Sequence, residues 1–288
     1  MAHPVSSSLR QLLVTENFAT QHDPWVALDG GRTNWVWKVG EDEQAVICKL
    51  YAAEDNNPVY PNLPGTEYDT LKALHAYGIA PEPLALLNST DGDLLIYRCL
   101  NGETWEQDAA PVADLLGRLH SIGLRFPLRR LASGSAALLQ QSRMILRGLE
   151  TALDPPTWMA NAMPVPPTVD LAILHTDVVP GNIISSAGTL RLIDWQCPAL
   201  GDPCEDIASF LSPAMQLLYR GQPLSADEQD AFLASYQNQM IVDRYQSLAP
   251  YYHLRIAAYC AWKLAKGEHD YAAACKAEVA ALEASQQS

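Results

Sequence analysis

The side chains best suited to chemistry lie close together in the sequence. His175, Asp177 and Asn182 follow the pattern H-x-D-x-x-x-x-N, and Asp194 comes twelve residues after the asparagine. Carboxylate and amide oxygens suit magnesium, which is commonly held by few protein groups together with substrate phosphates. The pattern therefore points to a hard-cation site. Asp177 and Asn182 would also be ordinary turn residues around the Pro-Gly pair between them.

An antiparallel hairpin would bring two of these side chains together. The runs 182–184 and 189–194 are short and apolar, and a small polar turn joins them. In a hairpin, the first residue of one strand lies near the last residue of the other. We therefore expect Asn182 and Asp194 at the same end, with Asp177 on the loop that leads into it.

Residues 25–100 have a strand-rich pattern that would position a second group of polar side chains. Lys49 lies inside the apolar run 45–51, where an unpaired ammonium group would be costly to bury. It is expected either to extend to an edge or to pair with an anion. The candidate partner is Glu67, in the first turn of a helix predicted to begin at Thr66, although an acid there also suits the helix dipole.

A glycine pair precedes the strand that carries Lys49. Gly30 and Gly31, followed by Thr33 and Asn34, have the form G-G-x-T-N between two predicted strands. Backbone N–H groups of such a loop can bind phosphate oxygens. A Gly-Gly pair in a hairpin is also often only a turn.

The pattern changes from strands to helices near the polar pair Asn101-Gly102. We predict an α+β fold with two lobes: an N-terminal lobe of antiparallel sheet, residues 1–100, and a larger, mainly helical C-terminal lobe, residues 101–288. The helices are predicted over residues 108–122, 134–152, 203–220, 226–245 and 251–266.

Composition excludes several classes of protein. Hydrophobic residues make up 48% and charged residues 18%, which suits a folded core rather than a disordered chain. Nineteen basic against 33 acidic residues give a net charge of −14, which argues against a nucleic-acid partner. Without a long apolar run or an apolar N-terminal signal core, a cytoplasmic protein with no membrane partner is expected. The six cysteines are scattered, so no zinc site is expected.

The segment 175–206 resembles the catalytic segment of the aminoglycoside phosphotransferase and choline kinase family, whose fold is similar to that of protein kinases. After the H-x-D-x-x-x-x-N pattern come I-D-W around Asp194 and the sequence G-D-P-x-x-D-I-A, which contains Asp206. The resemblance implies transfer of the γ-phosphate of ATP to a hydroxyl group with the help of Mg²⁺. Asp177 would orient or deprotonate that hydroxyl.

The same resemblance implies roles for the other candidates. Asn182 and Asp194 would hold magnesium, and His175 and Asp206 would brace the catalytic loop. The glycine loop is similar to that of choline and thiamine kinase relatives. The loop, Lys49, Glu67 and a hinge at Asn101-Gly102 also follow one another in the order found in kinases. The residues that would contact the nucleotide are Gly30, Gly31, Thr33, Asn34, Lys49, Glu67 and, through its backbone, Leu100.

The acceptor is expected to carry a positive charge as well as a hydroxyl. Asp202 and Glu205 follow the metal site closely and would be spare carboxylates if Asp206 is structural. Trp262 belongs to an aromatic group that could face a quaternary ammonium, or could simply be core. We predict a choline- or thiamine-kinase-like enzyme. The alternatives are an aminoglycoside or sugar phosphotransferase and a kinase-like module that binds nucleotide without turnover.

Overall fold

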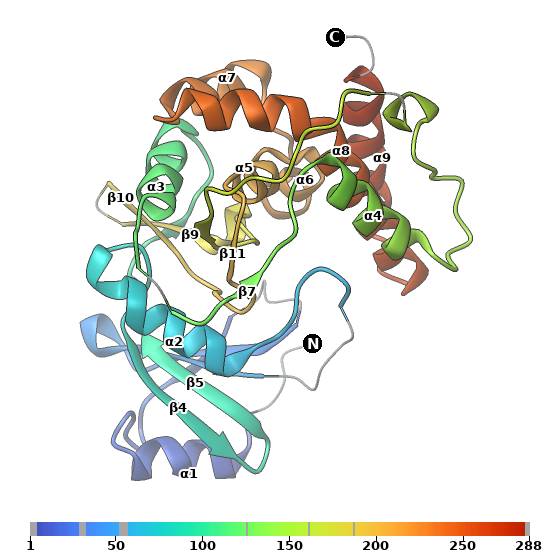
Figure 1. The fold of residues 1–288 in the computed structure, drawn as a ribbon. Coiled ribbons are helices and arrows are strands. Elements are labelled where there is room, and N and C mark those ends of the chain that lie inside the picture. The colour runs from blue at the N-terminus through green and yellow to red at the C-terminus, as the bar shows by residue number, and fades with distance from the viewer. Residues whose placement is uncertain are drawn as a thin grey trace. The chain divides into compact units, whose positions relative to one another are not determined.

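A computed structural model describes residues 5–28, 33–51, 57–124, 126–160, 162–186 and 188–285 (Figure 1). The chain divides into two compact units. Unit 1 comprises Met1–Thr104 and Ile183–Pro198, and unit 2 comprises Trp105–Asn182 and Ala199–Ser288. These units are groups of mutual contacts, so the predicted domain boundary after residue 100 stays a prediction.

Unit 1 is built on a five-stranded antiparallel sheet in the order β1-β2-β3-β5-β4. The strands confirm the strand-rich pattern predicted for residues 25–100. They are β1 (Trp25–Ala27), β2 (Trp35–Val39), β3 (Val46–Leu50), β4 (Pro83–Ser89) and β5 (Gly92–Arg98). A short 3₁₀ turn, η1 (Asp42–Gln44), precedes β3.

A helix absent from the sequence-based predictions packs on one face of this sheet. Helix α1 (Ser7–Thr15) contributes Leu9 and Leu13 to a core with Trp37, Val46 and other apolar residues of the strands. The Ser6 side chain accepts a hydrogen bond from the Leu9 N–H and so caps the helix. The Ser cap and the i,i+4 leucine pair are the sequence signals for this helix.

Helix α2 (Pro64–Leu74) carries Glu67 in its first turn, as predicted, but begins two residues earlier than Thr66. The predicted start was wrong because Pro64 occupies the first helical turn, where its missing N–H costs nothing and its fixed φ suits a helix. Among the described residues, no side chain caps this end with a hydrogen bond. The chain then passes through the 3₁₀ turn η2 (His75–Tyr77) into β4.

The predicted catalytic hairpin is present. Strands β9 (Ile183–Ser186) and β10 (Thr189–Leu192) pair antiparallel, with Ile183 opposite Leu192, and β6 (Glu103–Thr104) joins as a third strand. Gly102 permits this junction, because a Cβ there would lie 2.3 Å from the carbonyl oxygen of Ser185. The hairpin thus places Asn182 just before its first strand and Asp194 just after its second.

Unit 2 is mainly helical, and one small sheet in the order β7-β11-β8 accompanies the helices. Among the described residues, no helix has the length and apolar character needed to cross a bilayer. The helices are α3 (Ala110–His120), α4 (Ser135–Leu146), α5 (Cys204–Leu211), α6 (Pro213–Arg220), α7 (Ala226–Ser235), α8 (Gln239–Ala265) and α9 (Tyr271–Ala284). The strands are β7 (Arg129–Arg130), β8 (Ala172–Leu174) and β11 (Ala199–Gly201), and two 3₁₀ turns are η3 (Thr157–Ala160) and η4 (Pro180–Asn182).

Several predicted helix boundaries were wrong, and two of them lie near prolines. The helix predicted over 226–245 is divided at residues 236–238 between α7 and α8, and α9 was not predicted. The helix predicted over 203–220 is two helices, because Ser212 caps α6 and Pro213 begins it. Conversely, α8 runs unbroken through Pro250, where an interruption was predicted. Packing of α8 against α4 and α9, with Tyr251 and Tyr252 buried beside the proline, outweighs the local cost of that residue.

Candidate active site

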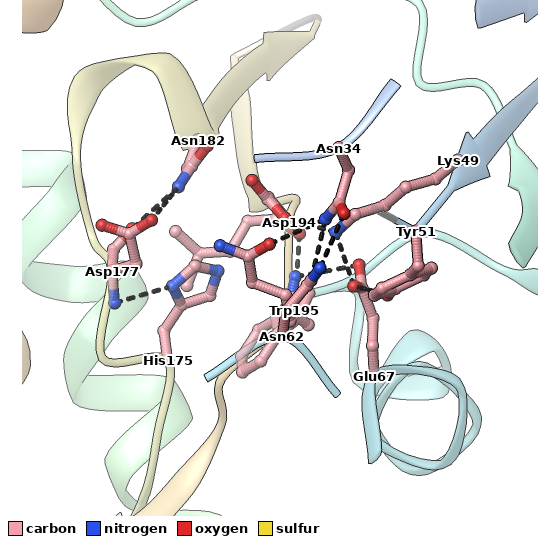
Figure 2. Close-up of polar contacts among 12 residues, drawn as sticks. Asn34, Lys49, Tyr51, Asn62, Glu67, His175, Asp177, Asn182, Asp194 and Trp195 are labelled. Atoms are coloured by element: carbon pink, nitrogen blue, oxygen red, sulfur yellow. Dashed lines mark hydrogen bonds and ion pairs between the residues drawn. The ribbon is translucent and has the colours of Figure 1, made fainter. Parts of the chain in front are cut away.

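The centre of unit 1 is a buried lysine held between two carboxylates. The Lys49 ammonium lies 2.6 Å from Glu67 Oε2 and also contacts Asp194 Oδ1 (Figure 2). The Lys49 and Glu67 side chains are only 2% and 1% exposed. The predicted pairing of the strand lysine with the helix glutamate is therefore confirmed. Burial alone would lower the pKa of Lys49, but the carboxylates of Asp194 and Glu67 outweigh it and raise that pKa.

Glu67 accepts hydrogen bonds from three residues that belong to two segments of the chain. Besides Lys49, it accepts hydrogen bonds from the Tyr51 hydroxyl and, through Oε1, from the Trp195 N–H at 3.1 Å. Burial raises the pKa of Glu67, and the nearby Lys49 ammonium and Tyr51 hydroxyl oppose that rise. Sequence reasoning missed Tyr51. Its signal is its position two residues after Lys49 along the strand, which places it on the same side.

Asp194 has a backbone conformation that costs free energy. Its φ is 63°, in the left-handed region that non-glycine residues rarely adopt. Such a residue persists at a cost of about 1–3 kcal/mol only when its surroundings fix it. Lys49 engages Oδ1, whereas Oδ2 has no hydrogen-bond donor among the described residues, and 28% of the side chain is exposed. One carboxylate oxygen therefore remains for a ligand.

The face of the sheet that carries Lys49 also presents apolar side chains. The register places Val36 opposite Lys49 and Val26 opposite Lys38, so these residues share one face. Val26 on β1 and Leu28, one residue beyond the end of β1, are 53% and 42% exposed. Exposed apolar side chains beside a buried ion pair can pack against a flat ring. Strand alternation in the sequence was the signal for this face.

The loop residues predicted to bind nucleotide differ in burial and in their contacts. Gly30 and Gly31 lie outside the described residues. Thr33 is half-buried, and Asn34 is buried with its amide directed at Asn62 and Gln196 rather than outward. Leu100, predicted to meet adenine through its backbone, follows β5 in a segment without regular structure and is half-buried.

In unit 2, the predicted catalytic loop is organised around Asp177. The side-chain amide of Asn182 donates to Asp177 at both its backbone oxygen (2.9 Å) and Oδ2 (3.2 Å). The Asp177 N–H donates to Nδ1 of the buried His175 at 3.3 Å. The bond from Asn182 orients the Asp177 carboxylate, and the bond to His175 holds the Asp177 backbone (Figure 2). Because the Asn182 nitrogen donates to Asp177, its oxygen is the atom available to a cation.

Asp206 fixes the backbone of this loop through hydrogen bonds. Its carboxylate is fully buried and accepts the N–H groups of His175 (2.9 Å) and Thr176 (2.7 Å). Thr176 has a left-handed φ of 70°, so these two bonds fix a strained segment. Asp206 also contacts His120 Nε2 at 3.1 Å, and His120 Nδ1 lies 2.7 Å from the Tyr236 hydroxyl. Sequence reasoning predicted the bracing aspartate but not these two partners.

Asp202 and Glu205 are not spare carboxylates, so that prediction was wrong. Asp202 Oδ2 accepts from Arg244 Nε at 2.8 Å, and Glu205 accepts from both terminal nitrogens of Arg255 at 2.9 and 2.6 Å. Both acids are buried. The arginines come from α8, 42 and 50 residues further along the chain, so local spacing could not reveal the pairs.

The aromatic group around Trp262 already faces cations of this chain. Trp262 stacks on Tyr259 with ring centres 5.8 Å apart. Lys263 Nζ lies 5.7 Å from the Trp262 ring centre and 5.5 Å from that of Tyr271, and Lys266 lies 5.2 Å from Trp262. Trp262 is half-buried, and its ring already lies beside lysines of this chain, so the structure gives no support to contact between Trp262 and a substrate ammonium.

The donors that remain fit magnesium. Oδ2 of Asp194 and the amide oxygen of Asn182 are hard oxygen ligands, and the hairpin connects them through the chain. Among the described residues, no group of three or more His, Cys, Asp or Glu side chains could enclose a metal. The residues present suit an ion bound largely through phosphate oxygens and water.

Comparisons with known proteins agree with this geometry. The sequence model of the Phosphotransferase enzyme family matches residues 24–251. Comparison with curated proteins gives no significant match.

The chain is also similar to solved structures over almost its whole length. A choline/ethanolamine kinase family protein from Mesorhizobium loti is 18% identical with a TM-score of 0.66, covering 97% of this chain and 94% of that one. A choline kinase from Cryptosporidium parvum is 14% identical with a TM-score of 0.65 and the same coverage. A spectinomycin phosphotransferase, in complex with ADP and spectinomycin, is 12% identical with a TM-score of 0.58, covering 96% and 94%. At these identities the likeness shows the fold: a protein-kinase-like α+β fold.

The buried ion pair predicts a specific stability pattern. Lys49→Met should lower the free energy of unfolding by about 3–5 kcal/mol, because Glu67 would stay buried without its cation. Adding Glu67→Gln should recover part of the loss, since the second change removes the unpaired charge. Urea denaturation of both variants measures this. Lys72→Met, which removes an exposed lysine of α2, is the matched control and should leave the midpoint unchanged. Equal stability of Lys49→Met and the parent chain would contradict the prediction.

Proposed function

Because the chain belongs to the phosphotransferase enzyme family, we propose that it is a small-molecule kinase that uses ATP and Mg²⁺ and phosphorylates a hydroxyl group. The observation that carries the proposal is the ion pair between Lys49 and Glu67, with Asp194 beside it. In the kinase template, a strand lysine paired with a helix glutamate contacts the nucleotide phosphates, and an aspartate after the catalytic segment holds magnesium.

Asp177 is the proposed acceptor of the hydroxyl proton. Support comes from its carboxylate, which Asn182 orients, and from the contact of its backbone with His175. A carboxylate in that role positions the hydroxyl and takes its proton as the new P–O bond forms. His175 and Asp206 are proposed to act only through the backbone of the loop.

Asn182 and Asp194 are the proposed magnesium ligands, each with one oxygen available. The ion neutralises charge on the phosphates when it is bound. The nucleotide is proposed to lie on the face of unit 1 that carries Lys49, with Gly30, Gly31 and Thr33 near the phosphates. Val26 and Leu28 suit the adenine ring, and the backbone at Leu100 suits its edge. The spectinomycin phosphotransferase with a similar fold is described in complex with ADP, which supports a nucleotide here.

The acceptor is proposed to be a cationic alcohol. The similar structures include enzymes named for choline and ethanolamine and for the antibiotic spectinomycin, and the chain itself has a net charge of −14. Asp202, Glu205 and Trp262 do not contribute to this argument, since residues of the chain already pair with them. Proteins that bind nucleotide without turnover are disfavoured because Asp177, Asn182, Asp194 and Lys49 are all present.

A screen for ATP consumption tests the function. The purified chain is incubated with ATP and Mg²⁺ and with one candidate at a time: choline, ethanolamine, thiamine, homoserine, a sugar or an aminoglycoside. The proposal requires consumption above the acceptor-free rate together with a phosphorylated product. Tight binding of ATP with no product from any acceptor would instead favour the non-catalytic alternative.

Asp177→Asn should lower kcat by about 100- to 10,000-fold and leave nucleotide affinity nearly unchanged. The change keeps the shape but removes the group that takes the proton, a role realised mainly in the transition state. Steady-state kinetics and nucleotide titration measure the two effects separately. Asp170→Asn, on the exposed chain before β8, is the control and should behave as the parent. Parent-like turnover in Asp177→Asn would remove Asp177 from the catalytic role.

Asp194→Ala should abolish the increase in nucleotide affinity that Mg²⁺ produces. The variant loses the proposed ligand, while Lys49 keeps its contact with Glu67. Titration of a non-hydrolysable ATP analogue with and without Mg²⁺ measures the effect. Asp69→Ala removes an exposed aspartate of the same unit and should retain the magnesium response. The same response in Asp194→Ala and the parent would remove Asp194 from the metal site.

A cationic acceptor should be preferred over a neutral one of the same shape. We expect kcat/KM for choline or another amine-bearing alcohol to exceed that of its neutral carbon analogue by about tenfold or more, the scale of one desolvated cation–π or ion contact. For choline the matched neutral compound is 3,3-dimethylbutan-1-ol. If neutral compounds perform equally, the cationic preference is wrong, although the phosphotransferase assignment stands.

A further inference from the structure

We propose that the side chains of Asn34, Asn62 and Gln196 form an amide clasp that positions Asp194 for magnesium-dependent nucleotide binding. The inference rests on the function proposed above and assigns positioning residues to it. The three amides come from distant segments: the end of the glycine loop, the approach to α2, and the chain two residues beyond Asp194. All three belong to unit 1.

Asn34 is the hub of the clasp. Its amide nitrogen donates to Asn62 Oδ1 and to Gln196 Oε1, both at 2.9 Å, and its oxygen accepts from Asn62 Nδ2 at 2.8 Å. One planar group therefore uses both hydrogens and its carbonyl. An aspartate has the same shape but no N–H group, so it cannot make either donor bond. Asn34 and Gln196 are buried, where lost partners are costly.

The clasp completes the support of the strained segment 194–196. Lys49 holds the Asp194 carboxylate, and Glu67 accepts the Trp195 N–H. Gln196 is held twice: by the Asn34 amide, and through its backbone oxygen by the Leu63 N–H at 3.2 Å. Since Asp194 has a left-handed φ, neighbouring contacts must maintain the direction of its side chain. The clasp adds a side-chain contact to Gln196, two residues after Asp194.

This arrangement explains why Asn34 is better understood as a positioning residue than as a direct phosphate contact. Its polar atoms are committed to Asn62 and Gln196, yet it follows the glycine pair after only two residues. The clasp thereby connects the loop proposed to meet phosphates with the segment that carries the proposed metal ligand. Breaking it should weaken the contribution of magnesium to nucleotide affinity rather than remove nucleotide binding altogether.

The test compares Gln196→Met with Gln196→Glu. Methionine keeps the length but loses the acceptor, whereas glutamate keeps an oxygen for the Asn34 N–H and is the rescue variant. The measured quantity is the ratio of the Kd values of a non-hydrolysable ATP analogue without and with saturating Mg²⁺. We expect this ratio to fall about tenfold in Gln196→Met, the scale of one buried hydrogen bond, and to recover at least in part in Gln196→Glu.

Asn34→Asp is the second variant, and it should reproduce the fall if Gln196→Met does not fold. Asn238→Asp is the matched control, because the exposed cap of α8 needs only a side-chain acceptor. A lower urea midpoint with an unchanged Kd ratio in Gln196→Met or Asn34→Asp would show a merely structural role and overturn the clasp. In that case the parent chain would still show magnesium-enhanced binding. Absence of that enhancement in the parent chain would overturn the proposed function, and the clasp with it.

Discussion

The structure of unit 1 depends on compensating the charge of one buried ammonium group, that of Lys49. Burying Lys49 is costly unless carboxylates compensate it with good geometry and hydrogen bonds. Glu67 supplies one from α2, and Asp194 supplies the other from the segment after β10. The sheet, helix α2 and the segment after the β9–β10 hairpin therefore all contact one charged group. This explains why residues 183–198 belong to the same compact unit as a strand more than 130 positions earlier.

The two units use the same means to fix strained backbone. In unit 1, contacts to Lys49, Glu67 and the amide side chains surround the left-handed Asp194. In unit 2, the carboxylate of Asp206 accepts two consecutive N–H groups and fixes the left-handed Thr176 next to Asp177. In each case a buried, fully engaged polar group stabilises a conformation that the local sequence disfavours. The strain therefore lies beside the side chains proposed to meet metal and hydroxyl, where accurate direction matters most.

The sequence predicted those features that depend on short-range patterns. Apolar runs separated by turns predicted the strands of the sheet, and the turn between two short apolar runs predicted the hairpin. A lysine in an apolar strand required an anion, and Glu67 was correctly named. Residue patterns failed where distant segments decide the outcome. The arginines of α8 neutralise Asp202 and Glu205, and packing carries α8 through Pro250. Neither the arginine pairing nor the packing of α8 can be predicted from the residues next to these positions in the sequence.

Because the carboxylates of Asp202 and Glu205 are paired, the acceptor must be recognised in another way than the sequence predicted. Asp202 and Glu205 each face an arginine, and Lys263, close to Trp262, also pairs with Glu268 at 2.6 Å. Groups that satisfy each other give little net field for attracting a cation and would have to lose an existing partner to bind one. Any preference for a positive acceptor must therefore come from groups whose charge is not already compensated.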